Sequence, residues 1–242
     1  VGAKVKGMLN EQDLSWLDMS WSSSLSADGS LLLFSDGHGG SGYSTVIRRI
    51  GEGTSSSISR LGPGASVSVS PNGRHALSVD LASAPQKLIV YPTGPGNPVT
   101  PPPGAIVKYE PDEPTPWFPD SKTFLFLASE PGKRSRMYKQ SVDGGAPMPF
   151  LADNVRVALV APDGETVIGL ENEEKWRRYS VDGKVAADVR GISSLDLPVG
   201  WTDDDRGLIV ATLTTPTRLA RVELATGLRK LIREVRPPGL ES

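Results

Sequence analysis

A short motif occurs five times along the 242-residue chain: a turn centred on Asp or Asn, followed by a run of apolar residues. The turn residues are Asp28, Asn72, Asp120, Asp163 and Asp204, so successive turns are 44, 48, 43 and 41 residues apart. Asp and Asn accept backbone hydrogen bonds in tight turns, and a following Gly supplies the positive φ that closes a hairpin. A period in the forties with about four strands per repeat is typical of a β-propeller.

Each repeat contains four segments that read as strands, and the sequence therefore predicts an all-β chain of five four-stranded blades. After a lead-in at 13–21, the expected strands are 31–34, 44–49 and 57–61; 66–70, 76–81, 87–91 and a weak 98–100; 115–118, 123–129, 136–141 and 147–151; 155–160, 166–171, 176–181 and 185–189; 197–201, 208–213, 219–224 and 229–235. In the central strand of the third repeat, Leu125 and Phe126 should both be buried, one on each face.

The repeats define the domain organisation that we expect. Residues 1–12 form an N-terminal extension and 13–242 a single propeller domain. The repeats span about 13–62, 63–104, 105–153, 154–193 and 194–239. Because the chain starts at Val1 rather than Met, we expect a fragment of a longer protein or a processed form.

Composition limits the classes of partner. The formal net charge of −2 gives no reason to expect nucleic acid, and no apolar run approaches the length of a membrane span. The chain has no cysteine, which removes thiolate nucleophiles and Cys-ligated zinc. We therefore expect no nucleic acid and no membrane contact by this segment, and the repeat scaffold with its varied loops favours a protein or peptide partner.

The turn resembles the repeat of the TolB-like propeller family over roughly residues 13–236. Three copies carry the proline of that repeat, at Pro71, Pro119 and Pro162, whereas Ala27 and Asp203 replace it in the first and fifth copies. TolB-like propellers usually have six blades, so the resemblance implies an incomplete six-bladed arrangement. Its missing blade would lie beyond Ser242, and the gap would be filled in part by 7–17 or by a neighbouring molecule; the alternative is a closed five-bladed ring.

The lead-in at 13–18 further resembles propeller segments attached to bacterial serine/threonine kinases that have an extracytoplasmic sensor region. That resemblance implies a signalling protein with an extracytoplasmic or periplasmic location. It says nothing about the ligand or the partner.

Two glycine- and serine-rich patterns are better explained as loops than as sites. Gly37–Gly42 matches G-x-G-x-x-G, but a dinucleotide site needs a helix next, and 43–47 is a β-type run. The same segment fails G-x-S-x-G, because Tyr43 stands where the last Gly should be. We predict a flexible hairpin loop without a bound nucleotide, and no cofactor elsewhere.

The titratable residues offer no convincing metal or catalytic set. His38 and His75 lie in separate repeats without a neighbouring ligand, and metal ligands come in sets. Asp203–Asp205 could bind a hard cation, but its position indicates a solvated turn. We predict no catalytic, cofactor-binding or metal residues.

Aromatic residues are interpreted mainly as core. The run 175–179 interleaves cations with Trp176 and Tyr179, as nucleic-acid binders also do, but the acidic chain favours an ordinary blade strand. The five tryptophans are most simply core, although any near a channel mouth could anchor a partner. They are Trp16, Trp21, Trp117, Trp176 and Trp201.

The sequence thus predicts a non-catalytic interaction or sensor module that binds a protein or peptide on one propeller face. The alternative is a ligand-binding or hydrolytic propeller of the lactonase or peptidase-associated type. For that function, loops from several blades would have to converge at the mouth of the central channel, with His38, Asp36 and Asp203 as candidates. Fold alone does not separate the two, because propellers serve both purposes.

Overall fold

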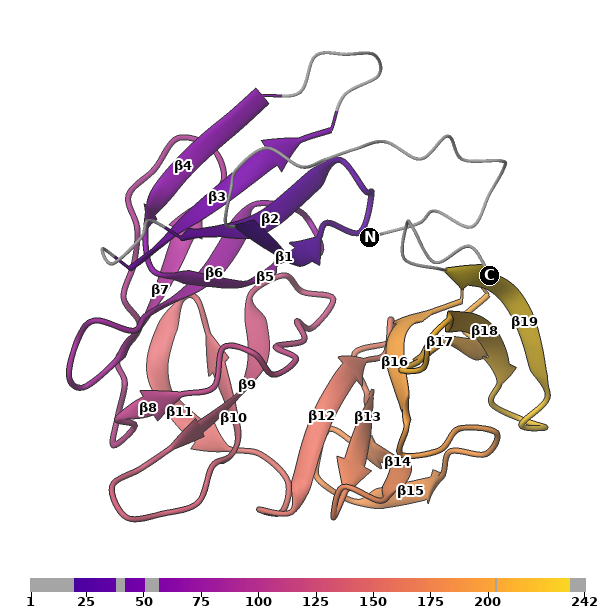
Figure 1. Ribbon diagram of the computed structural model, residues 1–242. Helices are drawn as coiled ribbons and strands as arrows, with labels where there is room; N and C mark the ends of the chain where they lie inside the picture. The colour runs from indigo at the N-terminus through magenta and orange to yellow at the C-terminus, as the bar shows by residue number, and fades with distance from the viewer. Residues whose placement is uncertain (1–19, 38–41, 51–56, 203, 236–242) are drawn as a thin grey trace. The chain divides into compact units, whose positions relative to one another are not determined.

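A computed structural model of the chain describes residues 20–37, 42–50, 57–202 and 204–235, and shows only strands, turns and loops over these ranges (Figure 1). The strands form five antiparallel sheets, which correspond to the five predicted blades. The chain divides into two compact units, 1–149 and 150–242, which are described separately. Within the described ranges, no helix is long and apolar enough to cross a membrane.

The first unit contains three sheets, with strand orders β1-β2-β3-β4, β5-β6-β7 and β11-β10-β9-β8. The strands are β1 (Ser20–Leu25), β2 (Leu31–Gly37), β3 (Tyr43–Arg49), β4 (Ser57–Pro63), β5 (Ala65–Val69), β6 (His75–Asp80), β7 (Lys87–Pro92), β8 (Lys108–Tyr109), β9 (Thr123–Ser129), β10 (Arg136–Ser141) and β11 (Gly144–Pro149). The strand after Gly42 is the one that the sequence predicts in place of a dinucleotide-binding helix.

The second unit contains two sheets, with strand orders β12-β13-β14-β15 and β16-β17-β18-β19. The strands are β12 (Val155–Val160), β13 (Thr166–Glu171), β14 (Lys175–Ser180), β15 (Val185–Asp188), β16 (Asp196–Trp201), β17 (Gly207–Thr212), β18 (Thr217–Glu223) and β19 (Arg229–Val235). All eight strands agree with the strand positions expected from the fourth and fifth repeats.

The five predicted turns share one hydrogen-bonded geometry. In every copy the side-chain oxygen of the turn residue accepts a backbone N–H from two residues further along, as expected for an Asx turn. The bonds are Ser30 N to Asp28 (2.9 Å), Arg74 N to Asn72 (3.0 Å), Lys122 N to Asp120 (2.9 Å), Glu165 N to Asp163 (2.7 Å) and Arg206 N to Asp204 (3.3 Å). The same side chain therefore forms the turn that precedes an apolar strand in each blade.

The residue after each turn acceptor has a left-handed backbone. The φ angles are 71° at Gly29, 68° at Gly73, 57° at Ser121, 71° at Gly164 and 56° at Asp205. Glycine adopts this conformation at no steric cost, whereas Ser and Asp are strained by their Cβ atoms. Two of the five blades therefore keep the turn although their sequence is less suited to it.

Two of the strand predictions are wrong. Residues 98–100 do not form a fourth strand of the second blade, and only an isolated bridge joins Val99 to Val90. The inner strand of the third blade is β8 rather than 115–118, where only a bridge joins Trp117 to Phe124. Prolines explain both errors, because proline cannot donate to a ladder and it flanks both segments.

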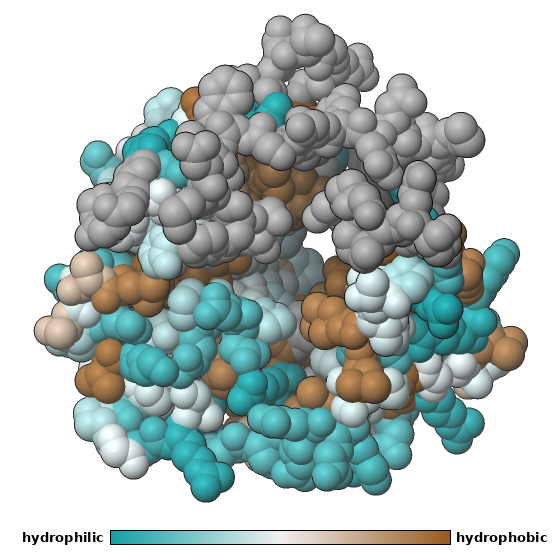
Figure 2. Space-filling view, in the orientation of Figure 1, coloured by the Kyte–Doolittle hydropathy of each residue, from teal (hydrophilic) through white to brown (hydrophobic). Residues whose placement is uncertain are grey.

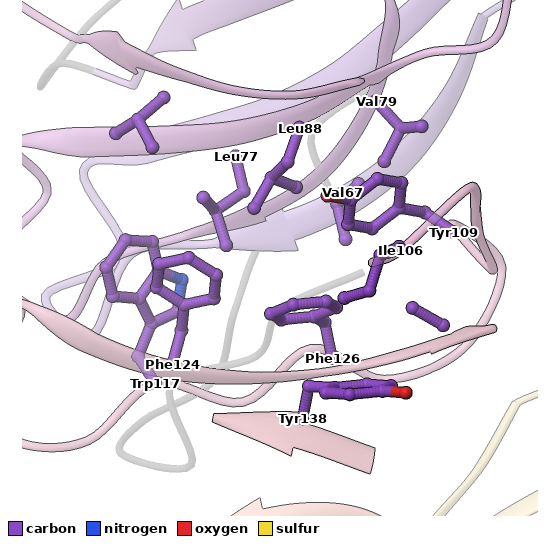
Figure 3. Packing of buried hydrophobic residues seen from close by; sticks show 12 residues of the cluster. Val67, Leu77, Val79, Leu88, Ile106, Tyr109, Trp117, Phe124, Phe126 and Tyr138 are labelled. Carbon is purple, nitrogen blue, oxygen red and sulfur yellow. The ribbon is translucent and has the colours of Figure 1, made fainter. Parts of the chain in front are cut away.

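An aromatic core lies between the second and third sheets of the first unit (Figure 3). Leu125 and Phe126 are both buried, as expected, and Phe126 packs between Tyr109 and Tyr138 with ring centroids 5.4 and 5.9 Å away. Trp117 and Phe124 lie side by side at 5.1 Å. Burial of such side chains supplies most of the stabilisation between neighbouring blades.

Some expectations fall on residues outside the described ranges. These include the closing role of 7–17, Trp16, His38 and Asp203. The single-domain organisation and the incomplete six-bladed arrangement remain predictions.

The turn geometry predicts opposite effects for two substitutions. A Cβ at Gly29 would meet no atom within 4 Å, so Gly29→Ala introduces only backbone strain and should lower the free energy of unfolding by about 1 kcal/mol. Asp205→Gly removes such strain and should raise it by about 0.5 kcal/mol. Urea unfolding of both variants tests this pair, and a destabilised Asp205→Gly would contradict it.

Candidate functional site

Asp36 is the one residue of the alternative hydrolytic set that the structure describes. It lies near the end of β2, and its buried carboxylate is 2.8 Å from Nη2 of Arg60 on β4. Nη1 of Arg60 donates to Ser44 Oγ at 2.7 Å. A carboxylate whose oxygen already contacts an arginine suits a structural ion pair better than a general base.

Hydroxyl groups fill the junction between the first and second sheets. Ser35 Oγ lies 2.8 Å from Ser66 Oγ, and Thr45 Oγ1 lies 2.6 Å from Ser78 Oγ. Thr45 also donates to the carbonyl of Gly64 at 3.0 Å, where the chain passes from β4 to β5. These small side chains satisfy one another's buried polar groups where the two sheets pack closely.

His75, Trp117 and Trp176 pack in the blades, whereas the side chain of Trp21 is outside the described part of the structure. The ring of His75 stacks on Trp117, with centroids 6.3 Å apart. The indole Nε1 of Trp117 donates to Ser68 Oγ at 2.9 Å, and that of Trp176 donates to the carbonyl of Ser193 at 2.9 Å. Trp117 and Trp176 are buried, as expected for core residues, whereas Trp201 is only partly buried.

In the acidic turn of the fifth repeat, the carboxylate of Asp204 is bound by donors of the protein itself. Asp204 accepts hydrogen bonds from Thr202 Oγ1 at 2.6 Å and from Arg221 Nη2 at 2.6 Å, and these lower its pKa well below the usual value. Over the ranges that the structure describes, no three or more His, Asp or Glu residues are grouped so that they could hold a metal ion.

The cation–aromatic run on β14 belongs to the blade. Trp176 and Tyr179 are buried, and Arg177 Nε lies 2.9 Å from the carboxylate of Glu171. A nucleic-acid surface would instead present aromatic faces for base stacking. This arrangement agrees with the interpretation as an ordinary strand.

The most elaborate polar site of the second unit surrounds Asp196, at the start of β16. Arg229 on β19 binds both oxygens of its carboxylate at 2.9 Å. Thr212 Oγ1 donates to it at 2.6 Å, and Ser193 donates through its backbone N and its hydroxyl at 2.9 and 3.0 Å. Arg229 also donates to Thr212 Oγ1. The site therefore links β19 to β16, the two strands at opposite ends of the sheet order.

Two opposing effects act on the pKa of Asp196. Burial raises the pKa, but the hydrogen bonds from Arg229, Thr212 and Ser193 outweigh it, so the pKa lies far below its ordinary value. The carboxylate remains ionised at neutral pH, and both of its oxygens accept hydrogen bonds from protein donors. We call this group of four residues the Asp196 clasp.

Two exposed leucines lie directly beside the clasp. Leu195 precedes Asp196 and Leu213 follows Thr212, and the backbone N of Leu213 donates to the carbonyl of Leu195 at 3.3 Å. Their exposed fractions are 66% and 69%, the kind of apolar exposure that marks contact sites when side chains gather. Figure 2 shows apolar residues at the surface around the position of β16 in Figure 1.

Sequence reasoning missed this leucine pair. Leu195 and Leu213 are separated by a whole hairpin, and each extends an apolar strand, so each reads as core. The one sequence signal for their exposure was that Leu195 and Leu213 both lie at the end of a predicted strand, next to a loop.

Comparison with known proteins supports the fold. No family profile matches the chain, and no curated protein is similar to it in sequence. Among solved structures, TolB from Acinetobacter baumannii superposes with a TM-score of 0.62 at 12% identity, covering 88% of this chain and 53% of that one. The chain therefore spans about half the length of that TolB. A TolB-type protein from Agrobacterium tumefaciens gives 0.64 at 15% identity, covering 89% and 81%.

An oligogalacturonate lyase in complex with manganese is also similar, with a TM-score of 0.58 at 14% identity, covering 88% of this chain and 64% of that one. At these identities the likeness concerns the fold, which is a TolB-like β-propeller as the repeat predicts.

The clasp predicts an acid-sensitive contribution to stability. Because the pKa of Asp196 is lower in the folded than in the unfolded chain, its contribution is present above about pH 4 and is lost as the pH falls. Asp196→Asn should lower the free energy of unfolding by about 2–3 kcal/mol at pH 7, and the difference from wild type should shrink in acid.

The matched control is Asp188→Asn, since the Asp188 carboxylate is exposed and 3.6 Å from Arg177. It should change the free energy of unfolding by less than about 0.5 kcal/mol. Equal effects of the two variants at pH 7 would contradict the role given to the clasp.

Proposed function

We propose that this TolB-like propeller is a non-catalytic interaction module, and that the Leu195–Leu213 pair contacts a protein or peptide partner. The observation that carries the proposal is the exposure of two adjacent leucines beside a rigid polar anchor. Apolar side chains gain most from leaving water when a partner covers them together.

The Asp196 clasp supports this role physically. The hydrogen bond from Thr212 to Asp196 fixes the residues next to the two leucines, because Asp196 follows Leu195 and Thr212 precedes Leu213 in the chain. A surface that is already ordered loses less conformational entropy when a partner binds. The leucines can therefore act as a preformed contact.

The second candidate function is a catalytic propeller, and the fold likeness to a manganese-bound oligogalacturonate lyase favours it. The contacts of the buried carboxylates in this chain support a catalytic function less well. Asp36 and Asp196 are the buried carboxylates of the described chain, and both are paired with arginine side chains.

Site-specific photo-crosslinking tests the proposed contact. A photoreactive phenylalanine analogue is placed at 195 or 213 in cells of the source organism, and covalent adducts are identified by mass spectrometry. The control position is Met148, an apolar residue of the first unit that is 61% exposed. We expect a discrete adduct from 195 and 213, and none of that mass from 148.

The double variant Leu195→Asn/Leu213→Asn should then bind the crosslinked protein at least about tenfold more weakly, the loss expected from two exposed apolar contacts. Adducts shared by all three positions would contradict the proposal. Manganese-dependent cleavage of oligogalacturonate, followed by the ultraviolet absorbance of the unsaturated product, would instead establish the catalytic function.

A further inference from the structure

The outermost strand of the last sheet has an edge that no strand of the described residues covers. β19 ends the order β16-β17-β18-β19, and no described strand pairs with its outer side. Every second residue of an edge strand directs its N–H and C=O away from the sheet, and such a row of groups can pair with another chain. Proteins normally protect these edges.

The other outer strands carry such protection. β4 ends in Gly62 and Pro63 and exposes no large apolar side chain, and β15 has only four residues. β11 contains two glycines and two prolines. The outer side of β7 is taken by Val99, which exchanges two backbone hydrogen bonds with Val90 at 2.8 and 2.9 Å.

β19 has neither the Gly and Pro residues, nor the short length, nor the covering segment of those strands, and its register is interrupted by a bulge opposite Leu219 and Ala220. It is seven residues long, contains neither Gly nor Pro, and leaves Leu231, Ile232 and Val235 exposed by 53, 37 and 43%. A long edge with exposed apolar side chains is the kind of strand that accepts a partner strand.

Charge indicates the chemistry of that partner. Of the five Lys or Arg residues between 217 and 235, Arg221 and Arg229 are already paired with Asp204 and Asp196. On β19 itself, Lys230 and Arg233 are exposed cations, and Glu234 is paired with Arg218 at 2.9 Å. An extended segment rich in Asp or Glu would complement this surface.

We propose that the free edge of β19 binds an extended acidic segment of a partner protein by strand addition. Backbone hydrogen bonds to the edge would supply affinity, and Lys230 and Leu231 would select acidic and apolar side chains at alternate positions. This contact is independent of the Leu195–Leu213 pair and of the function proposed for it.

The register identifies the backbone groups that would be used. Glu223 N donates to the carbonyl of Leu228 at 3.0 Å, and pairing then continues as Val222 with Arg229, Arg221 with Lys230 and Ala220 with Leu231. Hydrogen-bonded and non-hydrogen-bonded pairs alternate up to the bulge that follows Leu231, so Arg229 and Leu231 direct their N–H and C=O outward. Proline at 231 would therefore remove an outward donor and spare the internal ladder.

The test uses a fluorescein-labelled peptide of sequence Glu-Val-Glu-Thr-Glu-Val-Glu and fluorescence anisotropy. Leu231→Pro should weaken binding at least about tenfold, and Lys230→Glu should weaken it and reduce its dependence on salt. Lys175→Glu makes the same charge change at an exposed residue of β14 and should bind like wild type. Leu195→Asn/Leu213→Asn should also bind like wild type, which separates this test from that of the proposed function.

Amide hydrogen exchange of the wild-type protein provides a readout that needs no variant. Strand addition should slow exchange at Arg229 and Leu231 when the peptide is bound. Absence of peptide binding, equal affinity of a folded Leu231→Pro variant, or binding without protection at 229 and 231 would each overturn the proposal. If Leu231→Pro does not fold, Lys230→Glu and the exchange data decide.

Discussion

The interaction on which the five blades depend is the hydrogen bond from a backbone N–H to the side-chain oxygen of the residue two positions earlier. It occurs in all five turns, whether the acceptor is Asp or, at Asn72, an amide. The bond sets where each apolar strand starts. Since side chains alternate between faces, that starting point also decides which residues become buried.

Packing between blades depends on this register. In the third blade, Phe124 and Phe126 enter the cluster shared with the second blade, and Leu125 is buried on the other face of the strand. Where two blades approach closely, serine and threonine replace large side chains and satisfy each other, as in the Ser35–Ser66 and Thr45–Ser78 contacts. The hairpins thus determine both the apolar and the polar contacts of the blade faces.

Most of the strands could be predicted from sequence because turn, period and apolar run are local signals. Residues 98–100 and 115–118 could not, since flanking prolines remove the donors that a ladder needs. The Asp196 clasp was missed for a different reason: Asp196 and Arg229 are 33 residues apart, and neither lies in a motif. The exposure of Leu195 and Leu213 also depends on tertiary structure, because an apolar residue at a strand end reads as core.

The stability of Asp28 variants as a function of pH tests the role of the turn most directly. Hydrogen bonds from Ser26 and Ser30 lower the pKa of Asp28 to about 2, so its carboxylate contributes stability above about pH 4 that is lost as the pH falls toward 2. Asp28→Ala should lower the free energy of unfolding at pH 7 by about 1 kcal/mol and speed amide exchange at Ser30. Asp28→Asn should keep the turn, as Asn72 does, and lose the acid dependence of this site. An Asp28→Ala variant as stable as wild type, with unchanged exchange at Ser30, would contradict the account.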